Sequence, residues 1–432
     1  MLMEHGFSFT ASPREAEVIL LNTCGFVDDA KEESIQAILA LSAWKKKGDC
    51  RLLIVIGCLV QKYGAELEKA LPEADMFFGV ADWQPLLAYL KGYAVSPRQE
   101  PRRPRRLEVG DPEREVFCPS WSAAEKEGPA GYVKIAEGCS HRCTFCVIPQ
   151  IRGRYRSRGL SSVVSEVSAR VANGLREAVL VAQDTGAFGK DLMPPSSLAE
   201  LISMLSAVEG LERIRIMYCY PEEVNDGLIE AMKHPKVCPY LDMPIQHIDD
   251  GVLRRMARPL GGGELKRVIR KLREHIPGIA IRTTLMVGFP GESEEAFHSL
   301  LDFLEEYHLE RVGFFVFSPQ PDTPAETMPD QIPAPVKERR LAAAQEKRDV
   351  LLAQWQDSHV GQVIRVMVDK ETGHKGGRYE YEGRSCWDAP EIDGLVSFSG
   401  VGHFLPGQLA SVRITHSKDY ILSGEIANDF GK

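Results

Sequence analysis

The first part of the chain alternates short apolar runs with stretches of helical period. Apolar runs at residues 18–23 and 51–56 predict buried strands, and residues 29–44 between them predict an amphipathic helix. A shorter third strand is predicted at residues 76–78. Because strands that alternate with helices form parallel sheets covered by helices, we expect residues 1–93 to fold as an N-terminal α/β domain with a parallel sheet.

A longer series of the same pattern fills the middle of the chain. Apolar runs separated by helical stretches predict strands at residues 132–136, 178–182, 214–218, 240–243, 279–287 and 311–317. Six strand–helix units predict a partial barrel of the TIM type, whose active site would lie at the carboxyl ends of the strands. A long charged helix from about Pro335 to Ser358 closes this unit, so we assign residues 130–358 to the partial barrel.

The segments on either side of the predicted barrel have different patterns. Residues 94–129 lose this periodicity and are rich in Pro, Arg and Glu, which predicts a linker. Residues 359–432 alternate apolar and polar positions between glycine-rich turns, which predicts a small β-barrel. The sequence therefore predicts an α/β protein with three domains and a linker.

Composition is that of a globular protein from a reducing compartment. Of the 432 residues, 44% are hydrophobic and 26% are charged, and no apolar run reaches the roughly 20 residues that span a bilayer. Ten cysteines without an export signal indicate thiols used for metals or chemistry, so we expect a cytoplasmic protein with no membrane partner. The formal net charge of -9 argues against a nucleic-acid partner and favours a basic one.

Two clusters of arginine depart from this acidic balance. We interpret the first as part of a solvated linker, and we expect the second either to remain solvated or to contact an anionic ligand or an acidic target segment. The first cluster comprises Arg98, Arg102, Arg103, Arg105 and Arg106, and the second comprises Arg152, Arg154, Arg156 and Arg158.

Three cysteines at CxxxCxxC spacing, Cys139, Cys143 and Cys146, follow the first predicted strand of the barrel. Three thiolates can hold a four-iron cluster and leave the fourth iron open to a ligand. Two alternatives are a zinc site with His141 as the fourth ligand and three unrelated buried cysteines. Zinc sites usually pair CxxC with a distant second half, and none stands nearby, so the cluster is favoured.

An open iron suggests which cofactor could react there. It can bind the amino and carboxylate groups of S-adenosylmethionine and pass one electron into the sulfonium, which yields a carbon radical. Side chains at the strand ends could complete the cofactor site, although glycine turns of this kind are also common without a ligand. The residues we expect to contact this cofactor are Phe145, Gln183, Gln246, Gly288 and Glu292, whereas His247 alone is better explained as a structural histidine.

Two further cysteines follow predicted strands of the N-terminal domain. Cys24 comes directly after the first strand and Cys58 comes after the second. Because ligands gather outside the carboxyl ends of parallel strands, these two thiols could share a metal site on one rim. Two buried free cysteines remain the alternative interpretation at this point.

Motifs spread over the whole chain resemble those of the radical S-adenosylmethionine methylthiotransferases. These motifs are Asn22–Phe26, Gly57–Leu59, the cysteine triplet, Ala182–Thr185, Met243–His247 and Val287–Glu292. The tail segment Asp-Ala-Pro-Glu-Ile-Asp-Gly at residues 388–394 resembles the members that modify a ribosomal protein, whereas transfer-RNA-modifying relatives tend to carry a different sequence there. We therefore interpret this segment as a marker for a protein substrate.

The resemblance implies an activity, its cofactors and its partners. It implies transfer of a methylthio group to the β-carbon of an aspartate in small-subunit ribosomal protein twelve, with an electron donor as a further partner. It also implies two [4Fe–4S] clusters and S-adenosylmethionine. By resemblance, Cys139, Cys143 and Cys146 hold the cluster that cleaves the cofactor, Cys24 and Cys58 are two ligands of an auxiliary cluster, and the tail is a TRAM-like domain that grips the target. The acidic net charge agrees with a basic ribosomal substrate.

The sequence departs from the family at its beginning. Family members open with a strand and a Gly-Cys-Pro-Lys-Asn loop that carries the first auxiliary ligand, whereas Met1–Gly6 resembles the end of the helix after that loop. We expect that the true start lies upstream, and that the chain as given would hold a labile auxiliary cluster. The alternatives are a transfer-RNA adenosine methylthiotransferase, a radical enzyme with one cluster, and a non-catalytic iron–sulfur or zinc-binding docking protein.

Overall fold

The computed structural model describes residues 2–95, 106–113 and 128–427. It divides into two compact units, which we call the N-terminal unit (Met1–Ser122, Glu137–Arg156 and Ser318–Thr327) and the barrel unit (Ala123–Ala136, Ser157–Phe317 and Met328–Lys432). Most of the predicted linker, including four arginines of the first cluster, lies outside the described residues. The cysteine triplet belongs to the N-terminal unit, although the sequence placed it with the barrel.

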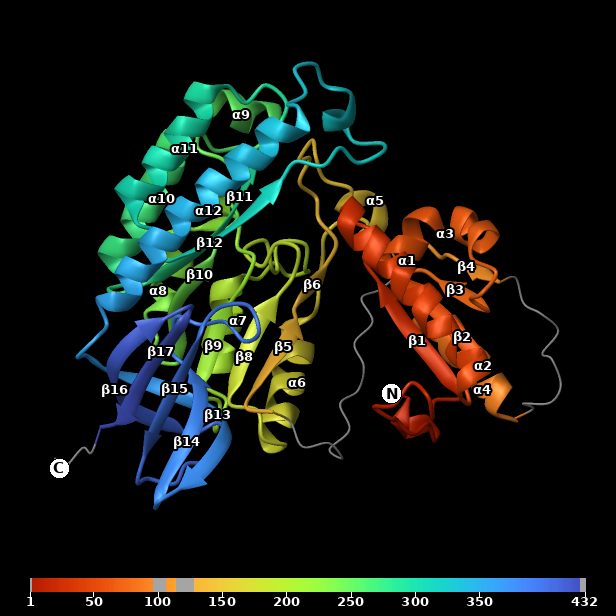
Figure 1. The fold of residues 1–432 in the computed structure, drawn as a ribbon, viewed down its shortest axis with the longest axis horizontal. Coiled ribbons are helices and arrows are strands. Elements are labelled where there is room, and N and C mark those ends of the chain that lie inside the picture. Colours follow the sequence, from red (N-terminus) through yellow and green to blue (C-terminus); the bar gives the residue numbers. More distant parts are fainter. Residues whose placement is uncertain (1, 96–105, 114–127, 428–432) are drawn as a thin grey trace. The chain divides into compact units, whose positions relative to one another are not determined.

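The N-terminal unit contains a four-stranded parallel sheet (Figure 1). Its strands, in sheet order, are β1 (Val18–Thr23), β2 (Leu52–Gly57), β3 (Met76–Phe78) and β4 (Leu107–Glu108). Its helices are η1 (Met3–His5), α1 (Asp28–Ser42), α2 (Trp44–Lys47), α3 (Cys58–Ala70), α4 (Trp83–Val95), α5 (Ile148–Arg152) and η3 (Pro324–Thr327). The predicted strands are confirmed, whereas β4 was missed because two residues carry no readable period.

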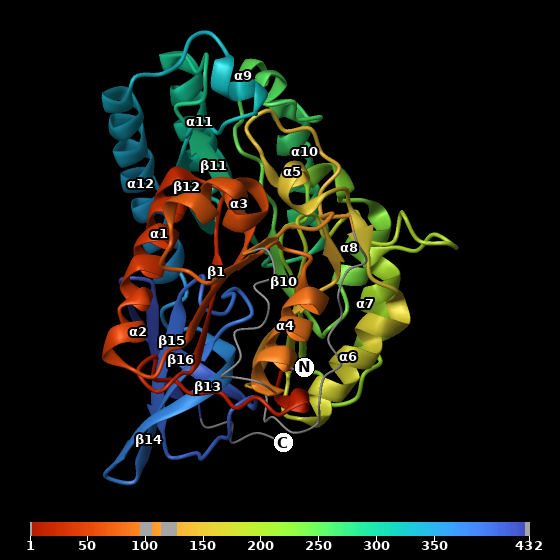
Figure 2. The same cartoon turned by 90° about the vertical axis from the view of Figure 1, so that its right-hand side faces the viewer.

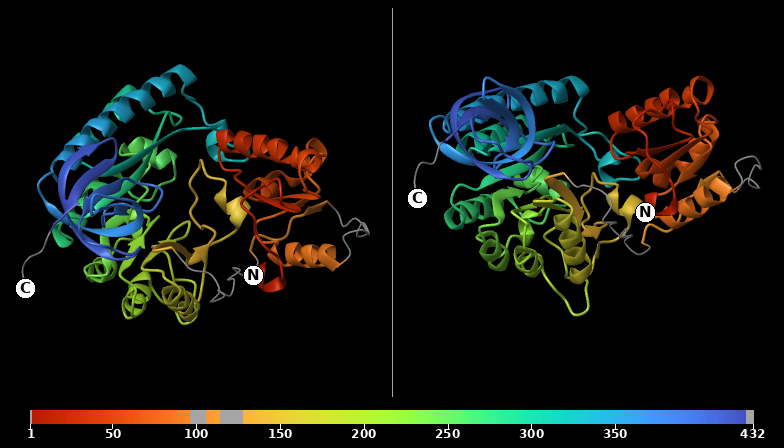
Figure 3. Two further views of the ribbon diagram at one scale, coloured as in Figure 1. Left: turned by 60° about the horizontal axis from the view of Figure 1, so that its bottom comes forward. Right: turned by 90° about the horizontal axis from the view of Figure 1, so that it is seen from below.

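Both faces of this sheet are covered, as its continuous apolar strands predicted. Leu53, Val55 and Phe77 pack on one face in a cluster that includes Ile38 of α1 and Leu67 of α3. Alternate strand residues pack on the other face in a cluster with α4, and they include Ile54, Ile56, Met76 and Phe78. The left view of Figure 3 shows α1 and α4 on opposite sides of the sheet.

The barrel unit is built on an open six-stranded sheet in the order β12-β11-β10-β9-β8-β5, and all of its strands are parallel. The strands are β5 (Ala130–Lys134), β8 (Glu177–Val181), β9 (Arg213–Ile216), β10 (Val237–Asp242), β11 (Ala280–Val287) and β12 (Arg311–Val316). Two short strands, β6 (Ala136–Glu137) and β7 (Arg156–Ser157), form a separate pair. The six predicted barrel strands are therefore confirmed, with shifts of a few residues at most.

Helices cover the outer face of this sheet, with α6, α7 and α8 forming a row over one half (Figure 2). The helices of the barrel unit are α6 (Leu160–Ala172), α7 (Leu198–Ser206), η2 (Pro221–Glu223), α8 (Asp226–Met232), α9 (Asp250–Arg255), α10 (Gly262–His275), α11 (Glu294–Tyr307) and α12 (Ala334–Asp357). Among the described residues, no helix combines the length and the apolar character needed to cross a membrane.

The predicted β tail is a closed five-stranded barrel, which we call the β-module. Its strands are β13 (Val363–Lys375), β14 (Arg378–Arg384), β15 (Leu395–Gly400), β16 (Leu409–Lys418) and β17 (Ile421–Ile426). Alternate residues such as Val366, Val368 and Val412 point inward and form its core. The right view of Figure 3 shows this barrel almost end-on as a closed ring.

The two aspartates of the tail segment that we interpreted as a substrate marker have internal partners, whereas Glu391 and Ile392 of the same segment are exposed. Asp388 accepts a hydrogen bond from Arg311 Nη2 at 2.5 Å, and Asp393 accepts one from the Tyr240 hydroxyl at 2.8 Å. Both carboxylate side chains are at most 5% exposed. These two aspartates therefore attach the β-module to β10 and β12.

Candidate active site

The loop that carries the three predicted cluster cysteines is closed by its own backbone. The Cys139 amide donates to the Gly153 carbonyl at 3.1 Å, and the Cys146 amide donates to the Cys143 carbonyl at 3.1 Å. Gly138 has a φ of +80°, and a Cβ there would lie 2.1 Å from the Arg154 carbonyl oxygen. Glycine is therefore required at this entry to the loop, because any side chain would push its two ends apart.

The chemistry of these thiols fits an iron–sulfur cluster. Burial, together with the neighbouring Cys143 and Cys139, raises the pKa of Cys146 to about 12. The Ile148 amide donates to Cys146 Sγ at 3.4 Å. Bound iron reverses this preference for the neutral thiol, because a coordinating thiol loses its proton. Within the described ranges, no three His, Cys, Asp or Glu side chains gather as they would around a single metal ion.

An ion pair joins the two ends of the cysteine loop. Glu137 precedes Cys139 by two residues, and Arg152 is the last residue of α5. Arg152 Nη1 donates to Glu137 Oε1 at 2.7 Å, and both side chains are mostly buried, with exposures of 28% and 11%. A partly buried, charge-assisted contact of this kind holds the loop in one conformation.

Cys24 and Cys58 lie where the sequence predicted them, at the carboxyl ends of adjacent parallel strands. Thr23 pairs with Gly57 in the sheet register, and each cysteine is the next residue of its chain segment. The two segments are in close contact, because a Cβ on Gly25 would lie 2.9 Å from Leu59 Cα. Their assignment as cluster ligands remains a prediction, but their position beside one another agrees with it.

Gly57 is the residue that allows this close approach. It has a φ of +108°, and a Cβ there would lie 2.4 Å from Asn22 Oδ1 and 2.7 Å from the Thr23 carbonyl oxygen. Residues with a side chain rarely adopt this backbone conformation, and neighbouring atoms already occupy the space that a Cβ would take. The glycine therefore lets β2 turn sharply into α3, which places Cys58 at the first position of that helix.

In the barrel unit, Gln183 and Gln246 lie at the carboxyl end of the sheet, as predicted. Gln183 is half-buried and comes two residues after the end of β8. The Gln246 amide donates to Thr284 at 2.9 Å, and its carbonyl accepts from Met286 at 2.8 Å, which fixes the residue against β11. Gln246 has a φ of +70°, a strained conformation that often occurs at functional sites.

Glu292 is held by the protein itself. Its Oε2 accepts hydrogen bonds from the Gly288 amide at 2.5 Å and from Arg340 Nη1 at 2.7 Å. His247 Nδ1 accepts from the Asp249 amide, so its Nε2 carries the proton and donates to Glu292 Oε1 at 3.2 Å. Both the Glu292 and His247 side chains are fully buried. This arrangement supports a positioning role for Glu292, and its contact with the cofactor stays a prediction.

The glycine loop after β11 packs closely against two other side chains. Gly288 has a φ of +75°, and a Cβ there would lie 2.4 Å from Lys337 Cγ. Gly291 has a φ of +81°, and a Cβ there would lie 2.6 Å from Arg255 Cζ. Packing within the protein is therefore enough to require both glycines, whatever contact Gly288 makes with a cofactor.

Most arginines of the second cluster have partners within the protein. Arg158 is buried and pairs with Glu166 at 2.6 Å, and Arg156 donates to the Pro112 carbonyl at 2.7 Å. Arg154 is 84% exposed and lies 3.6 Å from Glu113. In the first cluster, Arg106 donates to carbonyls at the end of α3. The arginines are therefore used mainly to hold loops in place.

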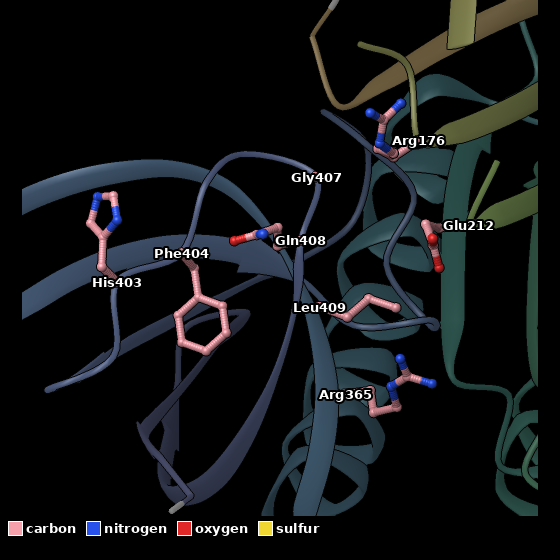
Figure 4. A pocket seen from close by; sticks show the side chains of 8 residues that line it. All are labelled: Arg176, Glu212, Arg365, His403, Phe404, Gly407, Gln408 and Leu409. Atoms are coloured by element: carbon pink, nitrogen blue, oxygen red, sulfur yellow. The ribbon is translucent and has the colours of Figure 1, made fainter. Parts of the chain in front are cut away.

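A groove of about 510 Å³ lies at the opposite end of the barrel sheet from the predicted site (Figure 4). Arg176 and Glu212 directly precede β8 and β9, and they face residues of the β-module across this groove. The β-module contributes Arg365, His403, Phe404, Gly407, Gln408 and Leu409. None of the predicted site residues lines the groove, so it is distinct from the candidate active site.

Sequence reasoning missed the residues that hold the predicted site in place. Arg152 also donates from Nη2 to Cys58 Sγ at 3.2 Å, and these two residues are 94 positions apart in the sequence. Arg340 donates to Glu292, which lies 48 positions before it. No local pattern relates residues so far apart. The only signal was the run of arginines after Cys146, which we had interpreted in terms of anions or solvent.

Three protein-family models match this chain. Residues 133–304 match the Radical SAM superfamily, residues 360–427 match the TRAM domain, and residues 1–79 match the Uncharacterized protein family UPF0004. The first two matches cover most of the predicted barrel and the β-module. They agree with the radical chemistry and with the TRAM-like tail that the sequence motifs implied.

Curated relatives match the chain over its whole length. A protein of Heliobacterium modesticaldum named ribosomal protein uS12 methylthiotransferase RimO is 44% identical, covering 100% of this chain and 92% of that protein. Proteins of the same name from Desulforamulus reducens and Geobacter sulfurreducens are 41% and 44% identical and cover 99% and 98% of this chain, and 95% and 93% of their own lengths.

A solved structure shows the same fold at low sequence identity. The radical S-adenosylmethionine methyltransferase TsrM from Kitasatospora setae, solved with a tryptophan substrate and a cofactor analogue, aligns with a TM-score of 0.54 and 15% identity. The alignment covers 84% of this chain and 69% of that one.

Proposed function

This chain belongs to the family of ribosomal protein uS12 methylthiotransferases, RimO, and we propose that it adds a methylthio group to the β-carbon of an aspartate of uS12. It is an enzyme of the radical S-adenosylmethionine superfamily, so its reaction uses an iron–sulfur cluster and S-adenosylmethionine. The target aspartate, the electron donor and a cytoplasmic location belong to the proposal.

The observation that carries this proposal is the cysteine loop within a chain of this family. A [4Fe–4S] cluster with S-adenosylmethionine supplies a carbon radical able to take hydrogen from an unactivated C–H bond. Cys139, Cys143 and Cys146 are the residues that would hold this cluster, and their CxxxCxxC spacing within one loop, closed by the hydrogen bond from the Cys139 amide to the Gly153 carbonyl, supports this assignment. The ion pair of Glu137 with Arg152 keeps that loop closed.

Residues of the barrel unit would bind and orient the cofactor. We expect Gln183 and Gln246 to contact it with their amide groups, and the Gly288 backbone to approach it at the carboxyl end of β11. Glu292 holds the Gly288 amide in place and is itself fixed by Arg340. From the N-terminal unit, we expect Phe145 to pack on the adenine.

Cys24 and Cys58 would supply two ligands of a second [4Fe–4S] cluster. Their position on one rim supports this assignment, and the resemblance to the family implies it. The number of clusters is open to direct measurement, because one four-iron cluster accounts for about four iron atoms per chain and two account for about eight.

The test uses anaerobically reconstituted protein with S-adenosylmethionine, dithionite and either purified uS12 or unmodified transfer RNA. We expect a mass increase of one methylthio group on a single aspartate of uS12, and no modification of transfer RNA. A Cys139→Ala variant serves as the control and should modify neither. Modification of adenosine in transfer RNA, with uS12 unchanged, would replace this proposal with the transfer-RNA activity.

A further inference from the structure

Arg152 contacts Cys58 on the sheet rim and Glu137 at the start of the cysteine loop. It lies six residues after Cys146, and its guanidinium donates from Nη1 to Glu137 Oε1 at 2.7 Å and from Nη2 to Cys58 Sγ at 3.2 Å. Glu137 in turn precedes Cys139 by two residues. One side chain therefore connects the loop of the three cysteines to a thiol on the rim of the neighbouring sheet.

The charge of Arg152 suits a thiolate at Cys58. The guanidinium of Arg152 is charged at any physiological pH. Its planar fork offers two parallel donors, so one can be anchored by Glu137 while the other is aimed at sulfur. A charge-assisted hydrogen bond stabilises an anionic acceptor more strongly than a neutral one.

We propose that Arg152 is a positioning residue that links the two iron–sulfur sites, by holding the Cys58 thiolate as a ligand of the auxiliary cluster from the closed cysteine loop. This inference rests on the proposed function, because it requires that Cys58 binds iron. Arg152 lies outside the coordination set and acts through the Cys58 sulfur.

This role has a consequence for reduction potential. Hydrogen bonds and positive charge near the sulfurs of a cluster favour its more negative, reduced form and so raise its potential. Removal of Arg152 should lower the potential of the auxiliary cluster. It should also weaken iron binding, because loss of a group that orients a metal ligand typically costs 10–100-fold in metal affinity.

The experiment isolates the auxiliary site in the full chain by replacing Cys139, Cys143 and Cys146 with Ala. In that background, Arg152→Met removes both the positive charge and the two guanidinium donors, whereas Arg152→Lys keeps the charge alone. Arg154→Met serves as a matched control in the same loop. After anaerobic reconstitution, we measure iron release to a chelator and the midpoint potential by spectroelectrochemical titration. Circular dichroism checks that each variant is folded.

We expect Arg152→Met to release iron at least about tenfold faster than the parent and to have a more negative midpoint potential. Arg152→Lys should fall between Arg152→Met and the parent, and Arg154→Met should equal the parent. If Arg152→Met does not fold, Glu137→Gln, which frees the guanidinium from its anchor, should give the same changes at smaller size.

The two possible failures are distinguishable. A parent that binds about four irons, with Arg152→Met releasing them at the parental rate and potential, overturns the role of Arg152 and leaves the second cluster in place. A parent that binds no iron overturns the second cluster and the role of Arg152 together. In either case, cleavage of S-adenosylmethionine by the chain with its native cysteine triplet remains a separate measurement.

Discussion

Glu177→Gln should destabilise the barrel unit, because Glu177 is the buried anion of a network that attaches the β-module. Its side chain is fully buried at the start of β8. Oε1 accepts from Arg215 Nε at 2.7 Å, and Oε2 accepts from Arg384 Nη1 at 2.7 Å. Gln keeps the shape of the side chain, but it leaves Arg215 without its counter-charge and Arg384 with Asp369 alone.

The expected magnitude follows from the pKa of this carboxyl. Burial alone would raise the pKa of Glu177, but Arg215, Arg384 and Arg213 lower it from its ordinary value of 4.5 to about 2. That difference corresponds to roughly 3 kcal/mol of stability at neutral pH. It agrees with the cost of about 3–5 kcal/mol for removing one partner of a buried ion pair.

The sign of the pH dependence follows from the same values. Because the folded-state pKa is below the unfolded value, the contribution is complete above about pH 4.5 and is lost as the pH falls toward about 2. The difference between native and variant protein in free energy of unfolding should therefore be constant from about pH 7 to pH 5 and shrink below that range.

Urea unfolding of both proteins at several pH values measures this difference. Glu382→Gln is a matched control, because Glu382 pairs with Lys370 at 2.7 Å on the β-module and the two side chains are 35% and 64% exposed. The control should lose less than about 1 kcal/mol. Equal losses in the two variants, or a loss from Glu177→Gln that stays constant down to pH 3, would refute this reasoning.

Three further substitutions test single positions. Glu292→Gln removes the buried partner of Arg340, so it should cost about 3 kcal/mol of stability and also weaken S-adenosylmethionine binding at unchanged iron content. Weaker binding at unchanged stability would instead indicate that Glu292 contacts the cofactor directly. Gly57→Ala should lower the free energy of unfolding by about 1–3 kcal/mol, because Gly57 has a positive φ and a Cβ there would meet Asn22. The control Gly92→Ala lies in α4 with open space around it and should stabilise the protein by up to about 1 kcal/mol. Equal thermal unfolding midpoints for the two variants would contradict this. Phe145→Ala should weaken cofactor binding in equilibrium dialysis without loss of iron, and unchanged affinity would remove Phe145 from the site.

The sequence was sufficient to predict the helices and strands and to show which residues follow the strand ends. Alternation of apolar runs with helical periods is a local signal, and it placed Cys24, Cys58, Gln183 and Gln246 correctly at carboxyl ends. Parallel topology then predicted which of these residues share a rim, and the pairing of Thr23 with Gly57 confirms this for the two cysteines.

The remaining features depend on contacts between distant residues. The glycine turn before Glu292 predicts a contact with the cofactor, but only the packed fold reveals that Glu292 also pairs with Arg340 on α12. Asp388 belongs to a recognisable segment, but its burial against Arg311 could not be read from that segment alone. Side-chain partners of this kind require the packed fold, because their energies come from burial and geometry.

The central claim is that the thiols of Cys139, Cys143 and Cys146 hold a cluster that cleaves S-adenosylmethionine. The most direct measurement is 5′-deoxyadenosine formed after dithionite is added to anaerobic, fully iron-loaded protein, compared with a Cys143→Ala variant. The account predicts 5′-deoxyadenosine from the native chain and none above background from the variant. Absence of this product from the native chain, or equal amounts from both proteins, would contradict it.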